Sequence, residues 1–400
     1  MASCLGIYIE DNIIKYAKVS KTNDSIRIES FGLKFYDKLG EAIEQVIEET
    51  YSYKIPISVN ISNENYNYFN IFNRLNKKDI ENFVKIEFES LCYEKEQQAE
   101  NFETRYVLTE ELEDKEKLKA IHISTNKTEI AKRMNLFSKY KLVNASPTAL
   151  SLTNLLDIKN ENGNIAIVNI EQATTVTIIN KQKIYDVINI EDGIEEILNK
   201  INIKENSYLK AYEACKNSTI YTSDGKELQY EENIYLEDIM PTLYNIVGKV
   251  KKILNESLFK IDKIYITGTA SVINNIDIYF QEYLDEARCE ILRPYFVNVA
   301  DMKINIKDYI EVNSAIALAL QGLDEGIKGI NFRKSSVSDN LPDWMKIEIE
   351  IPGLSKSSGT KFSEIFNSSG PLDRIERDLL RTAARFSATY YGIWSFNRYY

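Results

Sequence analysis

The sequence has few of the side chains that build metal and redox sites. It has 400 residues but only four cysteines and one histidine. Cys4, Cys92, Cys215 and Cys289 are far apart, and none has a partner at the CxxC spacing of such sites. His122 alone cannot complete a metal cluster. Scattered thiols are typical of a reducing cytosol, so we expect four small buried side chains and no metal site.

Basic charge and long apolar runs are also scarce. Asp and Glu number 60 against 49 Lys and Arg, which gives a net charge of −11. Affinity for phosphate backbones comes from Lys and Arg, so nucleic acid is a poor candidate partner. No stretch has the roughly 20 clean apolar residues of a membrane helix, and Met1 leads into a strand-like run rather than a secretory leader. We therefore expect a cytoplasmic protein.

The chain is built from one pattern used twice. A polar break at residues 160–163 separates the two copies, so we predict α/β domains at 1–160 and 161–326, an internal repeat of whole domains. Each copy opens with three consecutive predicted strands: 5–9, 13–19 and 25–33 in the first, and 164–170, 174–180 and 183–190 in the second.

Helices follow the strands in both copies. Apolar residues at helical spacing predict helices at 39–49, 78–91, 127–140, 236–258 and 312–323. Ser146 and Pro147, a capping residue followed by proline at the first turn, predict a further helix that runs to Leu156.

Five segments resemble the actin/hexokinase/Hsp70 superfamily, and within it the PilM family, which is related to FtsA. They are LGIYIEDNIIKYAKV (5–19), NIAIVNIEQATTVTIIN (164–180), YDVINIEDGIEEIL (185–198), IDKIYITGTASVI (261–273) and VNSAIALALQGL (312–323). The resemblance covers roughly residues 3–325 and implies an actin-like ATPase fold of two ribonuclease-H-like domains. It also implies that residues 52–126 form the inserted subdomain that PilM and FtsA carry in place of the one in actin.

The resemblance implies a nucleotide site whose key residues are replaced. Tyr8 and Asn169 stand where these families place the two aspartates that hold magnesium, and Glu10 and Glu171 stand where they place glycines. A carboxylate about 4 Å from a phosphate charge is repelled by on the order of 4 kcal/mol at an effective dielectric near 20. We therefore predict a pseudo-ATPase with no catalytic residue and no resident cofactor, and weak binding of ATP and magnesium stays an alternative.

Residues that could still line the degenerate site follow from the same alignment with the family. They are Glu10, Asp11, Asn12, Lys15, Asn169, Glu171, Thr174, Gly268 and Thr269. Lys15, Thr174 and Thr175 have an ordinary interpretation as strand and surface residues. A second alternative is that Glu10, Asp11 and Glu171 hold a metal ion themselves.

A second resemblance begins directly behind the last predicted helix. Residues 329–332, Gly-Ile-Asn-Phe, resemble the Ile-Asn-Leu motif near the N-terminus of the PilN family, which docks on PilM. The resemblance implies that Phe332 fills an apolar pocket and that Asn331 bonds backbone groups beside the inserted subdomain. Fusion raises the effective concentration of such a peptide to roughly millimolar, so Ile330, Asn331 and Phe332 could dock in cis or on a second copy.

The last part of the sequence differs in composition. Residues 327–372 comprise this motif and a linker rich in Ser, Gly and Pro. Residues 373–400 are predicted as a helix, basic at its start and aromatic at its end, which is either membrane-proximal or simply amphipathic.

Together these resemblances imply a cytoplasmic scaffold of the type IV pilus machine at the inner face of the membrane. Its partners would be a PilN/PilO-type membrane complex, the pilus assembly ATPase and its own PilN-like segment, with self-association included. Two rival functions remain: an active actin-like ATPase, and an FtsA-like membrane-tethered division protein.

Overall fold

The computed structural model describes residues 2–22, 25–110, 116–157, 163–222, 234–284, 287–296 and 309–333. These lie within one compact unit, residues 1–335, and the second unit, 336–400, lies outside the described residues together with the predicted linker and terminal helix. The predicted domain boundaries at 160 and 326 therefore stay predictions. In the part of the chain that the structure describes, no helix has the length and apolar character needed to cross a membrane.

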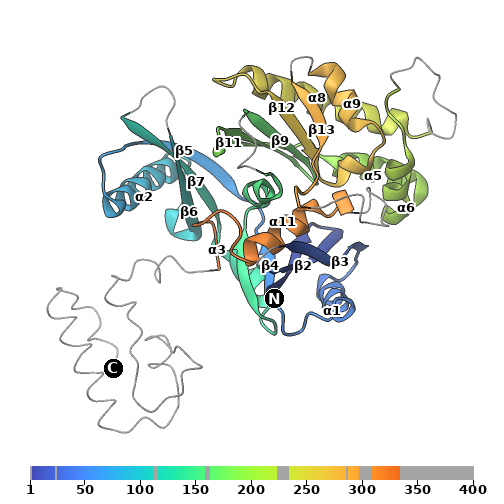
Figure 1. The fold of residues 1–400 in the computed structure, drawn as a ribbon, viewed down its shortest axis with the longest axis horizontal. Coiled ribbons are helices and arrows are strands. Elements are labelled where there is room, and N and C mark those ends of the chain that lie inside the picture. The colour runs from blue at the N-terminus through green and yellow to red at the C-terminus, as the bar shows by residue number, and fades with distance from the viewer. Residues whose placement is uncertain are drawn as a thin grey trace, which may run out of the picture. The chain divides into compact units, whose positions relative to one another are not determined.

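The first sheet has the order β3-β2-β1-β4-β8, and Figure 1 labels β3, β2 and β4 of it. Its first three strands pair antiparallel, whereas β4 and β8 join parallel to them. The strand bounds are β1 Ala2–Ile9, β2 Ile13–Lys21, β3 Ile26–Phe35, β4 Ile57–Asn60 and β8 Leu142–Ser146. The helices that accompany them are α1 Leu39–Glu49, α3 Lys127–Leu136 and α4 Thr148–Ser151, the last continued by the 3₁₀ helix η2 Leu152–Leu155. β8 stands at the edge of this sheet.

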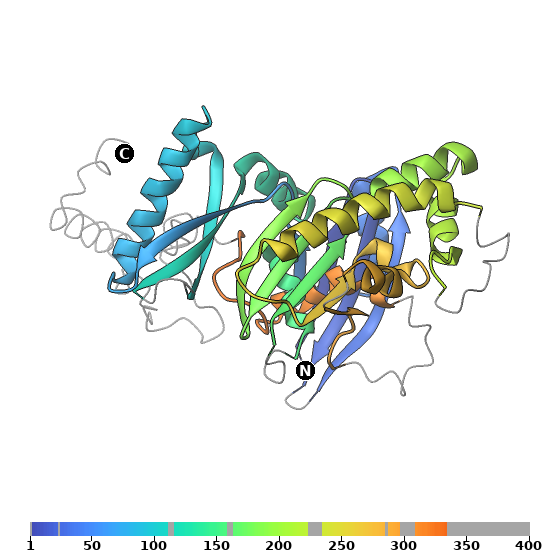
Figure 2. The ribbon, with the colours of Figure 1, turned by 90° about the horizontal axis from the view of Figure 1, so that it is seen from above.

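The second sheet repeats the first in the order β11-β10-β9-β12-β13, with the same pattern of antiparallel and parallel pairs. Its strands are β9 Ile165–Ile170, β10 Thr174–Asn180, β11 Lys183–Ile190, β12 Lys263–Thr267 and β13 Arg288–Ile291. Its helices are α5 Ile194–Glu205, α6 Tyr208–Asn217, α8 Leu236–Asn255, η3 Thr269–Val272 and α9 Ile276–Tyr283. Figure 2 shows α8 running across this sheet. The predicted repeat is therefore present as two sheets of identical order.

A third sheet, β5-β7-β6, lies within the predicted insert at 52–126. Its elements are β5 Asn65–Phe72, α2 Lys77–Glu94, η1 Ala99–Asn101, β6 Phe102–Glu110 and β7 Lys117–Asn126. The buried face of α2 packs on this sheet through Ile80 and Val84. His122 is 1% exposed, and its ring lies 4.5 Å from that of Phe88. Burial lowers the pKa of His122 to about 4, so this histidine is a neutral core residue.

Helix α11, Asn313–Gly322, is buried along almost its whole length and packs on β1 (Figure 1). A helix that is apolar all round is stable only inside a core. Gly6 of β1 permits the close approach, because a Cβ there would lie 1.9 Å from the carbonyl oxygen of Ala315. α11 also carries Ser314, which contacts the candidate site described in the next section.

Three predicted helices end early. The one predicted at 236–258 ends at Asn255. The helix predicted at 127–140 ends at Leu136, because buried Phe137 begins a turn that leads into β8. The helix predicted from Ser146 to Leu156 is wrong as a single α-helix, since it changes to 3₁₀ geometry at Leu152. The Ser151 and Thr153 hydroxyls there donate to the carbonyls of Pro147 and Leu150, contacts that compete with regular helix geometry.

The four cysteines are all free and buried, as predicted. Burial raises the pKa of the Cys4 and Cys215 thiols to about 12. These side chains are therefore unreactive core residues.

Candidate functional site

The turns that follow β1 and β9 contact each other. The backbone N–H of Gln172 donates to Glu10 Oε1 at 2.7 Å. The Gln172 side-chain amide donates to Asp11 Oδ2 at 2.9 Å and to Glu195 Oε2 at 3.0 Å. Two segments more than 150 residues apart, predicted as the paired phosphate turns, are thus joined directly by side chains.

A buried ion pair lies between the same two strand pairs. Lys15 Nζ on β2 lies 2.5 Å from Glu171 Oε2, and the two side chains are 0% and 2% exposed. A fully buried ammonium group is stable only with a counter-charge and hydrogen bonds. Glu171 supplies that charge from the opposite half of the molecule.

Two further residues donate to the Glu171 carboxylate. Oε2 accepts from the backbone N–H of Thr269 at 2.9 Å and from its hydroxyl at 2.5 Å. Oε1 accepts from the Ser314 hydroxyl at 2.7 Å. Both carboxylate oxygens are therefore bonded to protein donors, and the centre of the site is occupied by a side chain of the chain itself.

Glu10 is the carboxylate of this site with a clearly raised pKa. Its Oε1 accepts from the Tyr8 hydroxyl at 2.8 Å as well as from Gln172. Burial and the nearby Glu171 carboxylate raise the pKa of Glu10 to about 7, against the opposing effect of Lys15. Burial also raises the pKa of Tyr8 well above its ordinary value, so its hydroxyl stays protonated and donates.

The remaining predicted residues around this centre differ in their contacts. The Thr174 hydroxyl donates to the Asp192 carbonyl at 2.7 Å, whereas the Thr175 hydroxyl and Asn169 Oδ1 have no hydrogen-bond partner among the described residues. Gly268 has φ +92°, and a Cβ there would lie 2.5 Å from the Ile170 carbonyl oxygen, so only glycine fits.

A small cavity lies beside the turns. Its volume is about 20 Å³, and it is lined by Glu10, Asp11, Asn12, Ile13, Gln172, Ile194, Glu195, Leu198 and Tyr208. That volume holds about one water molecule.

The alternative of a metal site gains no support from this geometry. Within the described ranges, no group of three His, Cys, Asp or Glu side chains could hold an ion. Glu171 is bonded to Lys15, Thr269 and Ser314, and Glu10 is bonded to Tyr8 and Gln172, so neither offers a free oxygen cluster.

The sequence predictions missed Tyr8 as a hydrogen-bond donor, and they missed Gln172 and Ser314 altogether. The sequence pattern could have indicated Ser314, because Asn313 and Ser314 are two polar residues at the start of an otherwise apolar helix. Asn313 Nδ2 donates to the Leu292 carbonyl at 2.9 Å, so both residues of that pair make buried polar contacts.

A second candidate site lies at the edge strand β8. The backbone N–H of Phe332 donates to the Ala145 carbonyl at 2.8 Å. Asn331 Oδ1 accepts from the Ala145 N–H at 3.2 Å, and Asn331 Nδ2 donates to the Val143 carbonyl at 3.0 Å. The segment thus continues the first sheet at its edge. One backbone hydrogen bond from Phe332 and two hydrogen bonds of the Asn331 side-chain amide hold it there.

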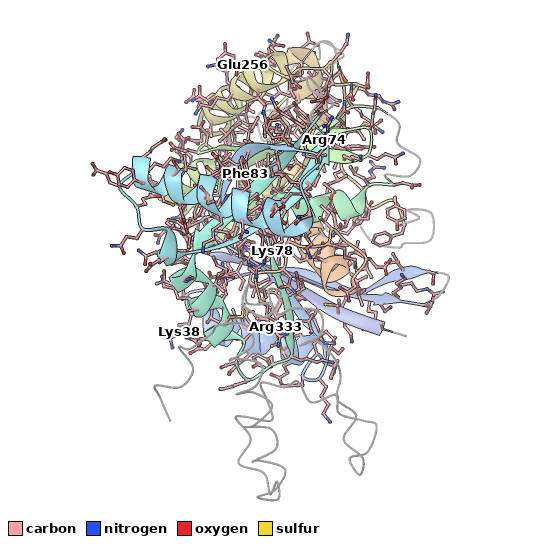
Figure 3. All side chains as sticks on the ribbon, turned by 90° about the vertical axis from the view of Figure 1, so that its left-hand side faces the viewer. Lys38, Arg74, Lys78, Phe83, Glu256 and Arg333 are labelled. Carbon is pink, nitrogen blue, oxygen red and sulfur yellow. The ribbon has the colours of Figure 1, made fainter. Side chains whose placement is uncertain are left out.

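The apolar residues of this segment enter the core. Ile330 and Phe332 are 0% and 2% exposed and belong to the same core cluster as the first sheet. Arg105 of β6 lies over Phe332, with its guanidinium 5.1 Å from the Phe332 ring, and its Nε donates to the Asn331 carbonyl at 3.0 Å. Arg333 is exposed, so the chain returns to the surface directly after Phe332 (Figure 3).

No family model and no curated protein sequence matches this chain. Among solved structures, one described as the "PilM-PilN type IV pilus biogenesis complex" is similar with a TM-score of 0.66 at 14% identity, over 80% of this chain and 98% of the other. The ethanolamine utilization protein EutJ from Carboxydothermus hydrogenoformans has a TM-score of 0.44 at 11% identity, over 80% and 90%. MreB5 of Spiroplasma citri bound to ADP has 0.42 at 10% identity, over 81% and 98%.

The similarity to the PilM-PilN structure confirms the predicted fold class. The chain has an actin-like α/β fold, and its likeness to the PilM structure extends over nearly the whole of that protein. At this level of identity the comparison establishes the fold, and function has to be argued from the two sites.

Proposed function

We propose that the protein is a nucleotide-independent scaffold of a type IV pilus assembly machine. It would work in the cytoplasm at the inner face of the membrane and join a PilN/PilO-type membrane complex to the assembly ATPase. The observation that carries the proposal is the segment 330–332 on the edge of β8, with Ile330 and Phe332 buried and Asn331 bonded to the backbone of β8. This is how an extended docking peptide binds a sheet edge.

The likeness of the fold to a PilM-PilN complex supports this reading, because it supplies a protein with this architecture that assembles with PilN. Here the docking residues follow α11 in the same chain, so we propose that they are a PilN-like motif fused to a PilM-like body. The residues behind Arg333 would then lead toward the membrane, and exchange of the motif between copies would give self-association.

The nucleotide part of the proposal rests on the ion pair of Lys15 with Glu171. An incoming phosphate would meet the Glu171 and Glu10 carboxylates, and the lysine that could attract it is already paired. We therefore expect no binding of ATP with magnesium at micromolar concentrations in isothermal titration calorimetry of the full chain. Micromolar binding would overturn the nucleotide-independent scaffold.

A peptide-binding experiment tests the docking motif. The full chain is prepared with residues 330–332 deleted, and a fluorescent peptide with the sequence of residues 326–336 is added. We expect fluorescence anisotropy to rise with the deletion variant and to stay flat with the wild type, whose own segment occupies the edge of β8. A control peptide with Asn331→Ala and Phe332→Ala should not bind.

The opposite result is equally informative. If the deletion variant folds and the peptide still does not bind, the segment is an ordinary part of the core and the docking proposal fails. Recovery of the full chain with purified PilN/PilO-type proteins in vesicles then tests the membrane partner separately.

A further inference from the structure

The carboxylate of Glu171 is held by donors from both halves of the molecule. Lys15 belongs to β2 of the first sheet, and Ser314 belongs to α11, which packs on that sheet. Glu171 follows β9 of the second sheet, and Thr269 follows β12 of the same sheet. The contacts at 2.5 to 2.9 Å therefore cross from one half to the other through a single side chain.

We infer that Lys15, Thr269 and Ser314 form an oxyanion cradle whose resident anion is the chain's own Glu171 carboxylate. One cation, one backbone N–H and two hydroxyls converge on two oxygens, which is a donor set that any small oxyanion could accept. The cradle is fully buried, since Lys15, Thr269 and Ser314 are each at most 1% exposed.

The Glu171 carboxylate differs from a freely diffusing anion in its effective concentration at the cradle. Because Glu171 is covalently part of the chain, its effective concentration at the cradle exceeds that of a free anion in the cell. The two halves are therefore held together at this point without an external ligand. This inference rests on the nucleotide-independent part of the proposed function, but not on the pilus role.

Chemical rescue tests the cradle. Glu171→Gly removes the resident anion and leaves Lys15 buried without its counter-charge, so we expect the melting temperature to fall by roughly 5–10 °C. Sodium formate should then raise the melting temperature of this variant saturably, and sodium chloride at equal ionic strength should not. The wild type should show no difference between the two salts, because its cradle is occupied.

Glu49→Gln is the matched control. Glu49 Oε1 lies 2.6 Å from Lys34 Nζ, a separation like that of the buried pair, but the Glu49 side chain is 49% exposed. We expect a change of at most a degree or two and no response to formate, since surface pairs contribute little. If Glu171→Gly is as stable as Glu49→Gln, or if formate and chloride act alike on it, the cradle is refuted.

A double-mutant cycle keeps the test decisive if Glu171→Gly does not fold. Lys15→Met and Glu171→Gln each leave one buried charge unpaired, whereas the double variant removes both. We expect the double variant to lose less than the sum of the two single losses. Additive losses would overturn the inference.

Adding ATP with magnesium to the wild type in the same thermal scans separates the two proposals. A rise in its melting temperature overturns the nucleotide-independent scaffold. An additive cycle without any response to ATP overturns the cradle alone.

Discussion

The ion-pair site and the β8 edge are both filled by residues of the same chain, but different forces hold them. Glu171 is held by charge and by short hydrogen bonds to Lys15, Thr269 and Ser314. The segment 330–332 is held by two buried apolar side chains and by bonds to the backbone of β8. The first site needs every donor to be in place, whereas the second depends mainly on the area that Ile330 and Phe332 remove from water.

The difference also concerns what each site could release. Removing Glu171 from its cradle would leave the buried Lys15 ammonium unpaired, which would strongly destabilise the folded state. The segment 330–332 follows α11, and its removal would expose the edge strand β8, with which a similar peptide could pair. The ion-pair site therefore depends on a buried charge, whereas the β8 edge depends on buried apolar side chains and backbone bonds.

The largest effect should come from the apolar part of the β8 edge. Phe332→Ala removes a fully buried ring that also lies under the Arg105 guanidinium, so we expect a loss of about 3–5 kcal/mol in the free energy of unfolding. Urea unfolding of the full chain measures it. Phe72→Ala is the control, because Phe72 is 59% exposed and its loss should be far smaller. Equal losses would mean that burial at 332 adds nothing.

A smaller effect should come from the polar part of the same edge. Asn331→Ala removes the bonds to the Ala145 N–H and the Val143 carbonyl, and we expect a loss of about 1–3 kcal/mol. Faster amide hydrogen exchange at Ala145 should accompany it. The control, Asn101→Ala, changes an exposed residue. A stable variant with unchanged exchange at Ala145 would show that the side-chain amide does not hold the segment.

Much of the fold could be predicted because its strands and helices follow simple apolar patterns. β12 and α1 have the predicted bounds, since one is a short buried run and the other has a single apolar face with Ala42, Ile43, Val46 and Ile47. The helix predicted to Leu156 failed because Ser151 and Thr153 bond to backbone carbonyls four and three residues earlier, local contacts that apolar periodicity does not reveal.

The candidate sites were predicted as residue types but not as contacts. Lys15 and Glu171 were singled out separately, and nothing local indicates that residues 156 positions apart form an ion pair. Arg105 had no signal either, since a basic residue in a strand of the insert is ordinary until the fold places it over Phe332. Sequence supplies the chemistry of such sites, and only the packing of distant segments supplies their partners.

The smallest effect should come from Glu10 and should depend on pH. Its pKa rises from 4.5 to about 7 on folding, so the unfolded chain releases this proton first, and the wild type loses stability as the pH rises from about 4.5 to about 7. Glu10→Gln keeps an acceptor for Tyr8 and Gln172 but has no charge to release. We expect it to be more stable than the wild type by about 1–2 kcal/mol at pH 8 and by little at pH 4, because the partial exposure of Glu10 reduces the roughly 3 kcal/mol that a pKa of about 7 would give. Thermal unfolding of both proteins across this range measures the difference. A constant difference at every pH would show that the site does not raise the pKa of Glu10. The contrast between a charged site and an apolar one would then depend on Glu171 alone.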